Sequence, residues 1–179
     1  MKTALGEKTT REIGAIAEER GCRLLAIESA GAGRFTVLRV VLEHQDGSAV
    51  TVEDCEAVSR DVSAVLDAAD EISHRYTLEV SSAGLDRKLY SLDDARRFVG
   101  RRVRIKTDEA VVPKALERPG AKPPAISPAR NFGGVLESVD GDVLTVVDEA
   151  ERRIYNVRFG VIRLARLDYQ WPERGREGR

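Results

Sequence analysis

The chain has 179 residues, of which 42% are hydrophobic and 33% are charged. This composition is typical of a globular protein with a buried core, and the length favours either one large domain or two small ones. No apolar run approaches the roughly 20 residues that a bilayer requires, and the charged start lacks the apolar stretch of a secretory signal. We therefore expect a cytoplasmic protein without a membrane span.

The two halves of the chain carry opposite net charges. Residues 1–90 hold 11 Lys and Arg against 16 Asp and Glu, a net charge of −5, whereas residues 91–179 hold 18 against 14, a net charge of +4. An acidic surface attracts basic proteins, and a basic surface attracts phosphate. This asymmetry indicates a composite partner, such as a ribonucleoprotein.

The first elements in chain order are a helix and a strand hairpin. A capping pattern at Thr9 and Glu12 predicts a helix that ends before Gly21. Next come a short apolar segment at 23–28 and a small-residue turn, followed at 35–43 by alternation that makes one face strongly apolar. We expect these two segments to be strands packed on helices.

A second helix and a third strand complete the first domain. Thr51 and Asp54 form a helix start, and apolar residues follow at three- and four-residue spacing as far as Leu66. The segment 76–80 supplies the third strand. The order helix, strand, strand, helix, strand predicts an α/β layer domain over residues 1–90, with two helices on one face of a three-stranded sheet.

The second half predicts a small β-rich domain. Ser91 and Asp94 cap a linker helix over 91–100. Short strands are then predicted at 103–107, 132–139, 143–148 and 154–157, which favours an SH3-like (Sm-like) β-barrel over 101–170 and an α+β fold class for the chain.

Two irregular segments accompany this domain. Five of the six prolines fall in a segment at 108–128, which we expect to be an extended loop, and residues 171–179 are expected to be a disordered tail.

The residues that usually carry enzyme chemistry do not form a recognisable site. Ser81 and Ser82 follow a strand but lack the G-x-S-x-G pattern of a nucleophile elbow. Cys22 and Cys55 are interpreted as buried thiols. His44 and His74 are interpreted as exposed turn residues without companion ligands. We expect no catalytic residue, no metal site and no cofactor.

A cluster of basic residues spans the end of the linker helix and the following strand. Guanidinium and ammonium groups at this spacing are suited to binding RNA phosphate. The alternative is a solvated strand edge with a favourable helix-dipole contribution, and the residues alone do not decide between the two. The candidate RNA-binding residues are Arg96, Arg97, Arg101, Arg102, Arg104 and Lys106.

The stretch 76–89, which reads YTLEVSSAGLDRKL, resembles the hallmark segment of the RimP family, approximately Y-x-L-E-V-S-S-P-G-x-D-R-P-L. Ala83 and Lys88 stand where the family commonly has proline, so the turn has fewer φ restraints. Residues 54–60 and 162–167 also resemble family segments, and the similarity spans about residues 10–169.

The resemblance implies a monomeric ribosome maturation factor that is required for assembly of the small (30S) ribosomal subunit. Such a factor binds the immature small subunit through a basic small-subunit ribosomal protein and 16S ribosomal RNA. The candidate partner-binding residues are Glu79, Ser81, Ser82, Gly84, Asp86 and Arg87. Two interpretations of Arg87 remain at this point. Its side chain forms either an ion pair with Asp86 or an exposed contact with RNA or protein. A regulatory Sm-like RNA-binding module is the alternative function.

Overall fold

The computed structural model describes residues 5–31, 36–84 and 87–169. Contacts divide the chain into two compact units, Met1–Gly84 and Leu85–Arg179, called here the first and second units. The first holds nine Lys and Arg against fifteen Asp and Glu, a net charge of −6, and the second holds twenty against fifteen, a net charge of +5. The opposite charges of the two halves are therefore a property of the two units. Within the described residues, no helix has the length and apolar character to cross a membrane.

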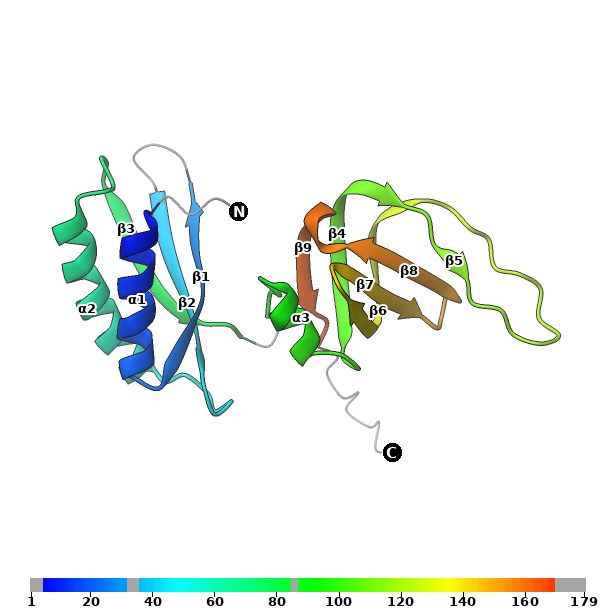
Figure 1. The fold of residues 1–179 in the computed structure, drawn as a ribbon, viewed down its shortest axis with the longest axis horizontal. Coiled ribbons are helices and arrows are strands. Elements are labelled where there is room, and N and C mark those ends of the chain that lie inside the picture. Colours follow the sequence, from blue (N-terminus) through cyan, green and yellow to red (C-terminus); the bar gives the residue numbers. More distant parts are fainter. Residues whose placement is uncertain (1–4, 32–35, 85–86, 170–179) are drawn as a thin grey trace, which may run out of the picture. The chain divides into compact units, whose positions relative to one another are not determined.

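The first unit has two helices on one face of a three-stranded sheet (Figure 1). Strand β1 pairs antiparallel with β2, and β3 pairs parallel with β2, in the order β1-β2-β3. The predicted order of elements is confirmed. The elements are α1 (Glu7–Glu19), β1 (Cys22–Ala30), β2 (Thr36–His44), α2 (Val52–Ala69) and β3 (Tyr76–Ser82).

The core of the first unit lies between the sheet and the helices. Leu38, Val40 and Leu42, alternate residues of β2, are buried completely or almost completely. They share one apolar cluster with Val58 and Val62 of α2. The alternation in this segment therefore identified the face of β2 that packs on helices, because side chains at every second position of a strand point the same way.

The start of α1 differs from the prediction. The helix begins at Glu7, and its N-cap residue is Gly6, which makes no capping hydrogen bond through a side chain. The predicted cap at Thr9 is therefore wrong. Instead, the carboxylate of Glu71 accepts the Gly6 amide at 2.6 Å and the Thr9 hydroxyl at 2.6 Å. These hydrogen bonds lower the pKa of Glu71. A residue distant in sequence satisfies the helix end, so the local pattern was misleading.

The start of α2 follows the prediction. Thr51 is the N-cap and accepts the Asp54 amide, while the Asp54 carboxylate accepts the Thr51 amide at 2.8 Å. This reciprocal capping box involves residues only three positions apart, which is why the sequence reveals it.

Over its described residues, the second unit contains one short α-helix, one 3-10 helix and a six-stranded sheet. The sheet order is β5-β8-β7-β6-β4-β9, and over the described residues β5 and β9 each have one strand neighbour. The chain is α+β as predicted, whereas closure into an SH3-like barrel stays a prediction. The elements are α3 (Leu92–Arg97), β4 (Arg102–Val111), β5 (Lys114–Ala115), β6 (Ala129–Asp140), β7 (Val143–Asp148), β8 (Arg153–Arg158), the 3-10 helix η2 (Phe159–Val161) and β9 (Ile162–Leu167).

The core of the second unit includes the helix that the sequence assigns to a linker. Ala95 of α3 is fully buried in the same cluster as Val103 and Ile105 of β4. The rings of Phe132 and Tyr155 stack in this core with centroids 4.0 Å apart. Packing of its apolar side therefore makes α3 part of the second unit.

The proline-rich segment is partly regular. Strand β4 continues to Val111, and β5 pairs with β8 through Lys114 and Ala115, so the long loop of Figure 1 begins after β5. The predicted loop at 108–128 is therefore shorter in the structure. The predicted tail at 171–179 lies outside the described residues.

Candidate functional site

Glu79 lies in a row of charges that crosses the sheet of the first unit. It stands opposite Arg39 of β2, which in turn stands opposite Glu28 of β1. The Glu79 Oε2 accepts hydrogen bonds from Arg39 Nη2 at 2.7 Å and Nε at 2.9 Å. Because Leu78 and Val80 pack on the core, Glu79 faces the side of the sheet without helices. Its side chain is 42% exposed, so it is accessible although ion-paired.

The other hallmark residues of the first unit form the end of β3 and the turn after it. Ser81 and Ser82 lie in register with β2, and the Ala83 amide extends the pairing by donating to the Leu42 carbonyl at 3.1 Å. Gly84 is exposed with a φ of +67°, a backbone conformation that favours glycine. Asp86 lies outside the described residues.

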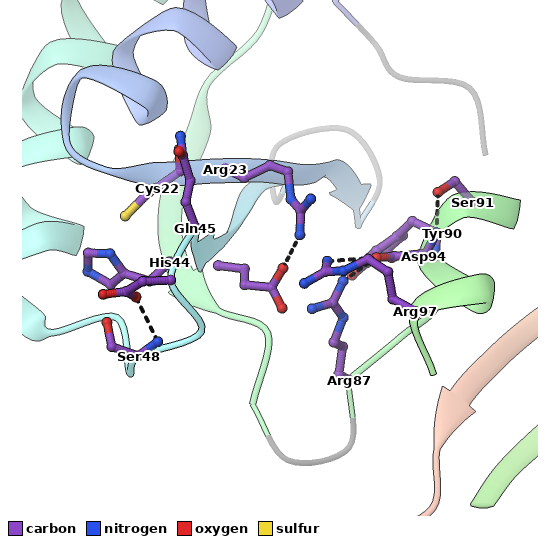
Figure 2. A network of polar contacts seen from close by, with 12 residues as sticks. Cys22, Arg23, His44, Gln45, Ser48, Arg87, Tyr90, Ser91, Asp94 and Arg97 are labelled. Carbon is purple, nitrogen blue, oxygen red and sulfur yellow. Dashed lines mark hydrogen bonds and ion pairs between the residues drawn. The ribbon is translucent and has the colours of Figure 1, made fainter. Parts of the chain in front are cut away.

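Arg87 is buried in the second unit, where Figure 2 shows it directed at Asp94. The two side chains form an ion pair and are 4% and 7% exposed. The Asp94 carboxylate also accepts the Tyr90 amide at 3.1 Å, and the Arg87 guanidinium lies 4.8 Å from the centroid of the Phe98 ring. In this structure Arg87 therefore joins the hallmark segment to α3.

Two of the six candidate RNA-binding residues, Arg96 and Arg97, lie on α3 and contact neighbouring groups. Arg96 pairs with Asp93 at 2.7 Å and donates to the Gly141 carbonyl at 3.1 Å. Arg97 lies 3.8 Å from Asp94, and its guanidinium is 5.8 Å from the centroid of the Phe98 ring. Both side chains remain partly exposed.

The other four residues lead into β4 and follow it. Arg101 precedes the strand and is exposed. Arg102, Arg104 and Lys106, called here the basic row, are exposed and alternate with buried residues along β4. The row therefore projects from one face of the sheet. Since β4 lies between β6 and β9, the alternative interpretation as a strand edge is wrong.

The neighbouring strands add one basic residue that the sequence did not reveal. Arg104 stands opposite Gly133 of β6 on one side and Arg166 of β9 on the other. The Arg104 guanidinium lies 3.3 Å from the carboxylate of Asp168. Only the register between β4 and β9 places Arg166 beside the basic row, and no local pattern encodes that register.

The structure also joins the end of β2 to the start of α2 through a histidine that was interpreted as an exposed turn residue. That interpretation is wrong for His44, whose side chain is 19% exposed. Its Nε2 lies 3.1 Å from Asp54 Oδ2, and its Nδ1 lies 3.2 Å from the Gly21 carbonyl oxygen. The hydrogen bond to Asp54 raises the pKa of His44, and hydrogen bonds from Thr51 and His44 lower the pKa of Asp54 to about 2.

This contact gives the first unit a predictable dependence on pH. Because folding raises the pKa of His44, the protonated imidazole stabilises the folded state. This contribution is complete below the unfolded pKa of about 6.5 and is lost as the pH rises through the folded pKa. The Asp54 contribution is complete above about pH 4 and is lost as the pH falls toward 2. We expect His44→Gln to lower the urea midpoint more at pH 5.5 than at pH 8.5, as measured by far-UV circular dichroism. An equal loss at both pH values would contradict this, and His74→Gln is the matched control.

No group of three or more His, Cys, Asp or Glu residues within 5–31, 36–84 and 87–169 is arranged to hold a metal ion. Both cysteines are free thiols, Cys22 buried and Cys55 partly buried. Burial raises the pKa of each thiol, which disfavours the reactive thiolate. The candidate site residues of the sequence analysis thus fall into two groups, the hallmark segment and the cluster around the basic row.

Comparison with protein families gives a match for most of the first unit. Residues 12–86 match the model of the RimP N-terminal domain. The match runs from α1 through β3 and ends at residue 86, so it contains most of the hallmark segment. The first unit is therefore similar to the N-terminal domain of the RimP family, and this match supports the RimP family for the chain.

Proposed function

We propose that this protein promotes assembly of the small (30S) ribosomal subunit in the cytoplasm by binding immature subunits as a monomer. One surface contacts a basic small-subunit ribosomal protein, and another contacts 16S ribosomal RNA. The protein acts by binding one assembly conformation better than its competitors, because a ligand shifts an equilibrium only through differential affinity. This action requires neither a catalytic residue nor a cofactor.

The basic row is the observation that carries the RNA contact. Its three exposed cations project from one face of a strand that is fixed on both sides by hydrogen-bonded neighbours. A rigid row of cations at two-residue spacing is suited to a phosphate backbone, since phosphate contacts supply most sequence-independent affinity for nucleic acid. Arg101 precedes the row, and Arg96 and Arg97 are proposed to contribute from α3.

The acidic first unit supports the contact with a ribosomal protein. Its net charge of −6 attracts basic proteins and repels RNA. Within the hallmark segment, Glu79, Ser81, Ser82 and Gly84 are proposed to contact that protein. Asp86, which follows in the sequence, is proposed to do so as well, and Arg87 to act by fixing the segment to α3.

Co-sedimentation tests this function. The purified protein is sedimented with immature small subunits, mature small subunits and whole ribosomes at two salt concentrations. We expect preferential binding to immature or free small subunits. Equal binding to any RNA, with a steep dependence on salt, would instead favour the regulatory Sm-like RNA-binding module.

Charge reversal of the basic row tests the RNA contact separately. The triple variant is Arg102→Glu, Arg104→Glu and Lys106→Glu. We expect the plot of log affinity against log salt concentration to become less steep, by about 2 in slope. Each phosphate contact contributes about 0.7 to this slope. The matched control reverses Lys114, Arg118 and Lys122, which are exposed and cause the same change in net charge. If the control loses as much affinity as the triple variant, net charge rather than the row determines binding.

A further inference from the structure

We propose that the free edge of β3, together with the groove between β3 and α2, binds an extended basic peptide that adds a fourth strand to the first sheet. The proposal concerns a site and a binding mode. That the peptide belongs to a ribosomal protein rests on the proposed function.

The first observation is the open edge. Within the described residues β3 pairs with β2 alone. The Ala83 amide points toward β2, since it donates to the Leu42 carbonyl. Backbone groups alternate in direction along a strand, so those of Leu78, Val80 and Ser82 point to the free edge. Such a row of amides and carbonyls is a template for an added strand.

The second observation is the pair of hollows beside this edge. One, of about 450 Å³, is lined by Val80 of β3 and by α2 residues that include Cys55 and Ser59. The other, of about 620 Å³, is lined by Leu78 of β3 and by α2 residues that include Ser63. These three small residues of α2 recur at intervals of four, so they lie on one helix face and leave space along the strand.

The arrangement specifies the chemistry of the occupant. Successive side chains of an added strand point alternately toward α2 and toward the side of the sheet without helices. Slender apolar side chains fit the hollows, which Leu78 and Val80 line, whereas side chains on the other side lie on the same face as Glu79. The first unit has a net charge of −6, which favours a basic occupant. The occupant is therefore an extended segment in which aliphatic and basic residues alternate.

The test uses the full chain, labelled with ¹⁵N, and the blocked heptapeptide Lys-Val-Lys-Val-Lys-Val-Lys as the probe. We expect amide shifts concentrated in β3 and along the α2 face that lines the hollows, and weaker binding of the corresponding Glu-Val peptide. Two further peptides, N-methylated at either the Val or the Lys positions, test backbone pairing. One set of peptide amides must face β3, so one of these peptides should lose binding and the other should keep it.

Two variants locate the site. Ser59→Tyr fills a hollow and is expected to weaken peptide binding about tenfold or more. Ala64→Tyr adds the same ring at an exposed α2 position that does not line either hollow, so affinity should stay within about twofold. Circular dichroism checks that both variants are folded.

Four results would overturn the proposal: no detectable peptide binding, unchanged affinity in Ser59→Tyr, equal binding of the Glu-Val peptide, or binding that survives both N-methylations. A dimer of the free protein that Ser59→Tyr dissociates would also overturn it, because a second copy would then occupy the edge. Each readout is independent of ribosomes. Subunit binding without peptide binding would reject this inference alone, and peptide binding without subunit binding would reject the proposed function alone.

Discussion

Arg87→Met is expected to lower the free energy of unfolding of the second unit by about 3–5 kcal/mol, the usual cost of removing one partner of a buried ion pair. The Arg87 and Asp94 side chains are almost completely buried, so the variant leaves the Asp94 carboxylate in a site from which water is largely excluded. The Tyr90 amide and the partly exposed Arg97 guanidinium, 3.8 Å away, compensate that charge only in part. Contact of the guanidinium with the Phe98 ring is lost as well.

Hydrogen exchange of β4 and β6 amides under native conditions measures this loss in the second unit alone. Arg96→Met is the matched control, because Arg96 pairs with Asp93 at the exposed surface, and its loss should cost at most about 1 kcal/mol. The double variant Arg87→Met, Asp94→Leu removes both charges and should recover part of the stability. A loss for Arg87→Met no larger than that of the control would show that the buried pair does not form in solution.

The Arg87 pair also shows what a short motif leaves open. From the sequence, the neighbouring Asp86 was the natural partner for an intramolecular ion pair. The structure pairs Arg87 with Asp94, which α3 brings back toward the hallmark segment. Asp94 was predicted to help cap this helix, and Ser91 does accept its amide. The Asp94 carboxylate also forms the ion pair with Arg87. That contact depends on how α3 packs and not on helix propensity.

Patterns within a few residues predicted most of the elements. The reciprocal cap at Thr51 and Asp54 spans three positions, and the alternation in β2 repeats every two. Both follow from the geometry of a single helix or strand. The contacts that sequence reasoning missed join distant segments, as between Glu71 and the start of α1 and between His44 and Asp54. Each of these requires the fold to be in place first.

The candidate surfaces were likewise predictable only in those features that depend on neighbouring residues. The basic row was predictable as a set of cations, because its three members occupy alternate positions of one strand. Its position in the middle of a sheet, beside Arg166, was not predictable, because strand order and register depend on pairing between segments far apart in the chain. The open edge of β3 was hidden for the same reason, although the strand itself was identified.

Gly134→Ala is expected to destabilise the second unit by about 3 kcal/mol, the upper part of the usual range for overpacking. Gly134 lies in β6, where an added Cβ would stand 2.3 Å from the Val147 carbonyl oxygen and 2.6 Å from its carbonyl carbon. The clash is with backbone, so no side-chain rotation relieves it. Strand β7 is paired on one side with β6 and on the other with β8, and any displacement of Val147 therefore disturbs two ladders.

Gly160→Ala is the matched control, since an added Cβ at Gly160 has open space around it. This variant should be neutral or slightly stabilising, because alanine restricts the unfolded chain more than glycine does. Urea unfolding followed by far-UV circular dichroism compares the two, and hydrogen exchange of the β7 amides locates the effect. Equal stabilities of the two alanine variants would mean that β6 and β7 pair in another register. Val135 would then not lie opposite Val147.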